Sequence, residues 1–229
     1  MFSRIYALFA YLGVMTIPAS FIMGFKYDPT APVANYGYNL ALYAAYIAIH
    51  FVMTLPRFKK TVYGRPQGAS SERRIYVTVA IVTWIILYAL HKPVPGFAVV
   101  PDYWVQYFGL CMVLVGVFAF FEFATFDALN SLFGVHGSEM SHSAGGETKL
   151  QTEGSYSKVR HPMYRAAVIL YLSSLIIHPN SAQLLFAVLV TLSFVLFIPF
   201  EEAALIRGRG EEYREYQKMV KWRVIPGVW

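Results

Sequence analysis

The sequence is short of charge and nearly devoid of cysteine, and both shortages narrow the class of protein. Only 14% of its 229 residues are Asp, Glu, Lys or Arg, whereas 57% are hydrophobic. A water-soluble domain of this length carries far more charge, so lipid is the expected solvent. Cys111 is the single cysteine, which excludes a disulfide or a cysteine-based metal centre within one chain. It lies in an apolar run, where we expect it to serve as packing.

The net charge of +6 does not indicate nucleic-acid binding. The basic residues flank apolar segments and do not alternate with aromatic residues on one face. Anionic lipid headgroups explain this placement, so we expect membrane lipid as a partner and no nucleic acid.

Six apolar runs account for about half of the chain, and most of them approach the ~20 residues that cross a bilayer. They cover roughly residues 5–24, 36–55, 75–90, 103–125, 164–178 and 182–200. The first run has the look of a signal peptide. It is longer than the apolar part of one and further runs follow, so we interpret it as a retained helix. The sequence thus predicts an all-α, polytopic membrane protein with about six transmembrane helices.

The basic residues also predict how these helices are oriented. If the N-terminus is cytoplasmic, every Lys and Arg except Lys26 and Lys92 falls in a cytoplasmic segment. This asymmetry follows the positive-inside rule and places both termini in the cytoplasm. We therefore expect a multi-pass integral membrane protein, in the inner membrane if the source is bacterial. A Gly/Ser/Thr-rich cytoplasmic segment at 126–160 has the look of a loop or lid.

The last two apolar runs predict a helical hairpin that turns at residues 178–180. The start of one helix and the end of the other then lie at the same level, so residues 160–164 (RHPMY) come beside Glu201 and Glu202. Taken singly, each residue has a structural interpretation. Arginine extends to headgroups, proline suits a first helical turn, and carboxylates favour a helix N-terminus. Their convergence is what indicates a functional site.

Two further candidates fall at the same depth, His50 in the second run and Glu122 in the fourth. A carboxylate inside VFAFFEFAT is expensive, so Glu122 is either functional or paired with a base. His50 alone is more typical of a histidine at a helix end. The other histidines lack ligand-like spacing, so we expect no metal site. In the tail, Tyr213, Tyr216 and Val220 share one helical face, which predicts an amphipathic tail helix against the bundle or the headgroups.

This combination of residue types suits a ligand that carries both signs of charge. A helix start with Arg160 favours an anion, whereas carboxylates and aromatic faces favour a cation. S-adenosylmethionine has a carboxylate and a sulfonium. NADPH would use the anion site but has less need of the glutamate pair.

A more specific pattern covers residues 150–226. It consists of EGSYSKVRHPMYRAA, FEEAALIRGRGEEYREYQKMV and IPG, in that order. The pattern resembles the C-terminal signature of the isoprenylcysteine carboxyl methyltransferase-like superfamily, which includes phospholipid methyltransferases. HFVMTLPRFKK, SSERRIYV and the FD…LFG of 126–134 look most like its methanethiol S-methyltransferase branch.

The resemblance implies an integral-membrane methyltransferase that binds S-adenosylmethionine at the cytosolic face. Carried over by position, it implies cofactor contacts from Leu150, Tyr156, Arg160, His161, Pro162, Tyr164, Glu201, Glu202 and Tyr213. Ala166 stands where the family has glycine and Arg165 precedes it, which narrows the expected pocket. The long loop before residue 150 also departs from the pattern. We expect it to affect the binding of the acceptor more than the binding of the cofactor.

Four residues are our catalytic candidates for an in-line methyl transfer. Arg160 orients an anionic acceptor or the cofactor carboxylate, Glu202 balances the sulfonium, and Glu122 or His50 acts as the base for the acceptor. The acceptor is small or lipophilic, a thiol such as methanethiol or a prenylcysteine carboxylate, and enters from the lipid.

Other functions fit the same scaffold. Membrane reductases of the sterol-reductase type resemble this C-terminal half and use NADPH, but their chains have more spans. A non-catalytic transporter or accessory protein is the other alternative, although a transporter more often shows two matching broken helices. We divide the chain into an N-terminal four-helix transmembrane region (1–125) and a C-terminal methyltransferase core (126–229).

Overall fold

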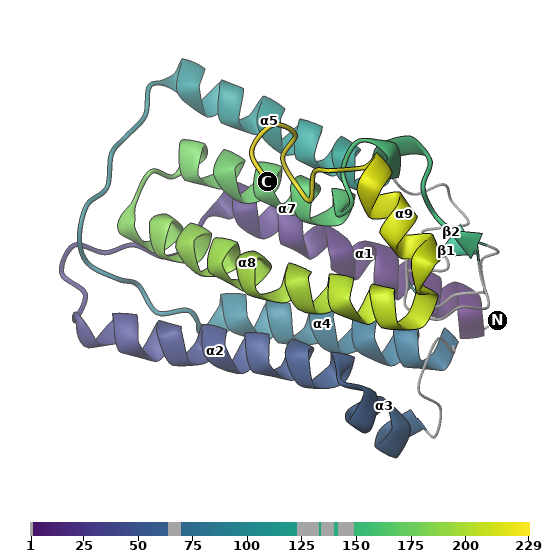
Figure 1. Ribbon diagram of the computed structural model, residues 1–229. Coiled ribbons are helices and arrows are strands. Elements are labelled where there is room, and N and C mark those ends of the chain that lie inside the picture. Colours follow the sequence, from purple (N-terminus) through teal and green to yellow (C-terminus); the bar gives the residue numbers. More distant parts are fainter. Residues whose placement is uncertain (1, 64–69, 123–132, 134–139, 142–148) are drawn as a thin grey trace.

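The computed structural model describes residues 2–63, 70–122, 133, 140–141 and 149–229. In this part of the chain, long helices run alternately up and down in one bundle (Figure 1). They are α1 (Phe2–Met23), α2 (Ala34–Thr54), α4 (Ser70–Leu90), α5 (Tyr103–Glu122), α7 (Pro162–Ile177) and α8 (Ser181–Arg209). Each overlaps one of the predicted apolar runs, so helices at these places are confirmed, whereas the crossing of a membrane by all six stays a prediction.

Shorter elements gather at one end of the bundle (Figure 1). They are α3 (Pro56–Tyr63), η1 (Gly154–Ser157), α9 (Glu211–Met219), and a two-residue parallel pair of β1 (Met140–Ser141) and β2 (Lys149–Leu150). We call this the α9 end, and the opposite end, where α7 turns into α8, the turn end. Most of the predicted loop or lid at 126–160 lies outside the described residues.

Four of the described helices are long and apolar enough to cross a membrane: α1, α4, α5 and α8. α7 is apolar but has only 16 residues, and tyrosine, asparagine and histidine lower the hydropathy of α2. Large apolar side chains face outward, for example Trp104 and Phe118, each 70% exposed. Such a surface is stable in lipid and costly in water.

α5 lies along α7 because two glycines remove side chains from the contact. A Cβ at Gly109 would come within 2.6 Å of Ile177, and one at Gly116 within 2.8 Å of Leu170. Small residues let membrane helices approach this closely. The packing role expected for Cys111 is wrong, because Cys111 is exposed. α5 contacts α7 through its glycines, and Cys111 lies on the apolar outer surface.

Aromatic rings fill the core of the half nearer the turn end. Phe25 stacks on Phe186 of α8 with 4.7 Å between ring centroids. Trp84 of α4 lies 5.8 Å from Phe186 and 5.9 Å from Phe21 of α1. These contacts set the position of α8 relative to α1 and α4.

Uncharged hydrogen bonds hold the turn between α7 and α8. Asn180 caps α8 by accepting from the amide of Gln183 at 3.0 Å. Gln183 accepts from the amide of Phe25 at 3.0 Å and donates to Ser174 Oγ. Ser174 Oγ in turn donates to the carbonyl of Phe21 at 2.8 Å. The predicted hairpin is confirmed, and the other ends of α7 and α8 lie close together at the α9 end.

Candidate active site

The residues before α7 are held in place by the C-terminal tail. The amide of Arg160 donates to the carbonyl of Trp222 at 2.9 Å, and that of His161 to the carbonyl of Arg223 at 2.8 Å. Pro162 takes the first position of α7, where its missing N–H costs nothing. This local structure leaves the Arg160 and His161 side chains free to reach α8.

Glu202 of α8 is the centre of a buried charged cluster. Its Oε1 accepts from Arg160 Nε at 2.7 Å and from His161 Nε2 at 3.3 Å. Its Oε2 accepts from Arg223 Nε at 3.0 Å. The Glu202 side chain is only 5% exposed. One carboxylate therefore faces two guanidinium groups, and its charge is fully compensated inside the protein. The predicted convergence of residues 160–164 with the glutamate pair is confirmed.

Arg160 joins three segments of the chain. Besides Glu202, it binds the carbonyl oxygens of Val220 and Lys221 through Nη1, at 2.7 and 2.8 Å. The residue is buried, with 6% of its surface exposed. These hydrogen bonds connect the start of α7 to α8 and to the tail after α9.

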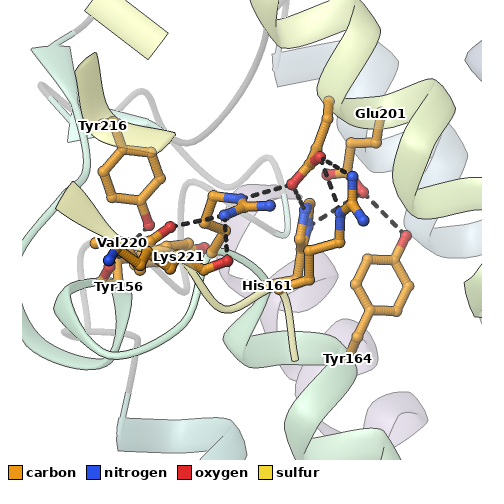
Figure 2. Close-up of polar contacts among 10 residues, drawn as sticks. Tyr156, His161, Tyr164, Glu201, Tyr216, Val220 and Lys221 are labelled. Carbon is orange, nitrogen blue, oxygen red and sulfur yellow. Dashed lines mark hydrogen bonds and ion pairs between the residues drawn. The ribbon is translucent and has the colours of Figure 1, made fainter. Parts of the chain in front are cut away.

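Glu201, one residue earlier, has different surroundings. Its Oε2 accepts from the Tyr164 hydroxyl at 3.0 Å and lies 3.7 Å from His161 Nδ1. Figure 2 shows the Tyr164 ring rising from α7 toward this carboxylate. Among the described residues no arginine or lysine pairs with Glu201, and its side chain is 39% exposed. Unlike Glu202, this carboxylate is not paired with a guanidinium group in the described part of the chain.

α9 closes another side of the cluster. Tyr213 and Tyr216 pack with Leu150 and Leu205 in a small apolar core. The Tyr216 hydroxyl donates to the carbonyl of Tyr156 at 2.7 Å (Figure 2). Burial raises the pKa of Tyr213 and of Tyr216, so both hydroxyls stay protonated. The predicted tail helix is confirmed, and it packs against the bundle.

The two candidates for the acceptor-side base are placed differently. Glu122 ends α5, and its side chain lies outside the described residues. The ring of His50 on α2 lies 5.8 Å, between centroids, from that of Tyr76 on α4. Tyr76 is close enough to Glu201 for an electrostatic interaction. His50 thus neighbours the Glu201 side of the site and not the buried charged cluster.

The sequence-based predictions missed Arg223 and Tyr76. No spacing relates either residue to the RHPMY motif, and the only signal for Arg223 was a basic residue beside IPG in the tail. Ala166 fits the need for a small residue, because it is fully buried. Arg165 points elsewhere, toward Ser155 Oγ at 3.5 Å.

Comparison with known proteins finds similarity to methyltransferases. Residues 104–211 match the family model for phospholipid methyltransferase. The chain is 28% identical to methanethiol S-methyltransferase 1 of Bradyrhizobium diazoefficiens over 81% of its own length and 66% of the relative's, just under two thirds of that protein. It is 27% identical to methanethiol S-methyltransferase of Mycobacterium tuberculosis over 80% of this chain and 75% of the relative. No solved structure matches.

The segment 104–211, which holds the RHPMY and glutamate motifs that meet at the α9 end, is thus similar to the phospholipid methyltransferase family. Over most of its length, the chain is similar to methanethiol S-methyltransferases. The proteins that it resembles are methyltransferases, and four of its described helices are long and apolar enough to cross a membrane.

Proposed function

We propose that this enzyme transfers the methyl group of S-adenosylmethionine to a small thiol. The observation that carries the proposal is the contrast between the two adjacent glutamates, since Glu202 is neutralised by arginines and Glu201 is not. The thiol class is supported by relatives that are named for methanethiol.

The residues at the α9 end fit a donor with a positive sulfur and a carboxylate. Glu201 supplies a carboxylate, and the ring of Tyr164 lies beside it, a combination that favours a cation. The first turn of α7 presents amide groups to an anion. This assigns to Glu201 the charge-balancing role that the sequence suggested for Glu202. Arg160 and Glu202 act as positioning residues that hold α7, α8 and the tail together.

The remaining predicted contacts belong to the same proposal: Leu150, Tyr156, His161, Pro162 and Tyr213 surround the donor. When bound, S-adenosylmethionine supplies an activated methyl group on a positively charged sulfur. The chain's own residues then have to align the acceptor, exclude water and remove the thiol proton.

We also propose the membrane arrangement that the basic residues predict. All six long helices cross the bilayer, α2 and the short α7 included, with both termini and the α9 end in the cytoplasm. The alternating directions of the six helices and the length of four of them support this arrangement. A cysteine introduced at exposed Val100, in a Cys111→Ser background, is expected to react with a membrane-impermeant maleimide in intact cells. Labelling only after lysis would show that the protein has the opposite orientation in the membrane.

Calorimetric titration of the detergent-purified protein with S-adenosylhomocysteine tests the donor site. We expect the wild type to bind and Glu201→Gln to bind about 10- to 100-fold more weakly, as for the loss of one charge-assisted contact. Glu215→Gln, on the exposed face of α9, is the matched control and keeps wild-type affinity. Binding of NADPH without any binding of S-adenosylhomocysteine would overturn the proposal in favour of a reductase.

A labelled-methyl assay tests the acceptor. The purified enzyme is offered labelled S-adenosylmethionine with methanethiol, a prenylcysteine or phosphatidylethanolamine, and volatile and lipid products are counted separately. We expect label in the volatile thioether. Label only in the prenylcysteine ester or in the lipid would contradict the thiol assignment and leave the donor assignment in place.

A further inference from the structure

His50, near the α9 end of α2, has a defined hydrogen-bonding pattern. Its Nδ1 lies 2.7 Å from the carbonyl oxygen of Tyr46, one helical turn earlier. A carbonyl oxygen only accepts hydrogen bonds, so Nδ1 carries the hydrogen. In the neutral ring, the lone pair is therefore on Nε2, which is the arrangement that a histidine base needs.

This lone pair has no partner in the part of the chain that the structure describes. Nε2 is buried, and no described donor reaches it. A buried polar atom with unused hydrogen-bonding capacity is costly unless water or a ligand satisfies it. His91 also has unpartnered ring nitrogens among the described residues, but it follows α4 at the turn end, far from Glu201. Among the described residues, His50 is thus a histidine at the α9 end whose Nε2 is buried and unpaired.

The surroundings of His50 suit a small apolar molecule. Two titratable side chains face it: Tyr46 on its own helix, with 4.2 Å between ring centroids, and Tyr76 on α4 at 5.8 Å. α8 contributes the apolar ring of Phe197, which stacks on Phe51, the residue after His50. No described charged side chain contacts His50, and the nearest link to charge runs through Tyr76 to Glu201.

We infer that His50 Nε2 accepts the proton of the thiol acceptor, a catalytic role that rests on the proposed function. An ordinary thiol has a pKa of about 8.5, so it is mostly protonated at neutral pH. The S–H bond breaks, its electron pair stays on sulfur, and the proton forms the Nε2–H bond. The resulting thiolate is the nucleophile for the methyl group. The imidazolium then returns its proton to water, which restores the neutral ring.

The pH dependence of kcat/KM for methanethiol tests this inference in the detergent-purified full-length enzyme. For His50→Gln we expect a rate about 100-fold lower at pH 7, because general base catalysis is lost. The deficit shrinks below about tenfold near pH 9, because the thiol then ionises unaided. His178→Gln is the matched control. His178 is also bound to a backbone carbonyl, that of Ile22 at 2.7 Å, but it lies at the turn end.

Two further measurements separate the possible outcomes. His50→Gln should keep the thermal midpoint and the S-adenosylhomocysteine affinity of the wild type within about twofold, because Glu201 and Tyr164 are unchanged. A deficit of equal size at every pH would overturn the proton-acceptor role, as would an undiminished rate at pH 7. If the wild type itself methylates no thiol, the proposed function fails, and that result is distinct from a failure of the His50 variant alone.

Discussion

The two ends of the α7–α8 hairpin are held by different kinds of interaction. At the turn end, Gln183 and Ser174 use neutral hydrogen bonds to bind the backbone around α1. At the α9 end, Glu202 binds the two charged side chains of Arg160 and Arg223 and also contacts His161. Both networks are buried, and both connect segments that are far apart in the sequence. Holding the fold together therefore does not by itself require charge.

Burying charge is the more expensive solution. Desolvation offsets much of the attraction within a buried ion pair, and neutral or apolar replacements are often as stable. The α9 end nevertheless keeps its charges, and they fix the backbone on both sides of Glu201. This difference indicates that the turn end stabilises the fold, whereas the α9 end positions residues for the chemistry that we propose.

Glu202→Ala tests this contrast with the largest expected effect. The substitution leaves two guanidinium groups without their buried carboxylate, so we expect a loss of about 3–5 kcal/mol in stability and no detectable methyl transfer. Thermal unfolding in detergent and titration with S-adenosylhomocysteine measure the two consequences. Wild-type stability together with wild-type binding would show that the charged cluster positions nothing.

Gln183→Ala examines the neutral network. It removes the acceptor of the Phe25 amide and the hydrogen bond that Ser174 Oγ accepts, so we expect a loss of about 1–3 kcal/mol in stability. S-adenosylhomocysteine affinity should not change, because the site lies at the other end of the bundle. A weakened affinity, measured at a temperature where the variant is fully folded, would contradict the division of roles between the two ends.

Asn180→Ala removes only the cap of α8. The amide of Gln183 loses the side-chain oxygen that accepts from it, and we expect a loss of about 1 kcal/mol. Asn180→Asp retains a capping oxygen and serves as the control. Equal thermal midpoints for the alanine and aspartate variants would show that the cap does not stabilise the turn.

Lys218→Ala tests an ion pair that is exposed to solvent and not buried. Lys218 pairs with Glu215 at 2.6 Å, but the two side chains are 67% and 56% exposed. Solvent screens such a pair, so we expect no measurable change in thermal midpoint or in activity. A clear effect here would mean that the importance of Glu202 does not depend on its burial.

The helices and the meeting of the two motifs could be predicted because both follow from local patterns. Runs of about 20 apolar residues form helices in lipid, where no water competes for the backbone. A short turn at Pro179 makes the last two helices antiparallel. Arg160 and Glu202 then have to lie at the same end, as they do.

The division of labour between Glu201 and Glu202 could not be predicted in this way. Adjacent residues on a helix point about 100° apart, so one glutamate faces the tail and the other faces Tyr164. Which is which depends on how α8 is rotated against its neighbours. The contact between Arg223 and Glu202 could not be predicted either, because the tail returns to the start of α7 only after α9 has packed.

The sequence by itself determined that this chain forms long apolar helices, that it resembles membrane methyltransferases, and that polar residues meet at one end of its last hairpin. Apolar length and motif order suffice for that, because both act along the chain. Only the tertiary structure decided which charges neutralise one another and which stay available. Burial and partner geometry set the state of Glu201, Glu202 and His50, and these depend on segments that meet in space and not in sequence.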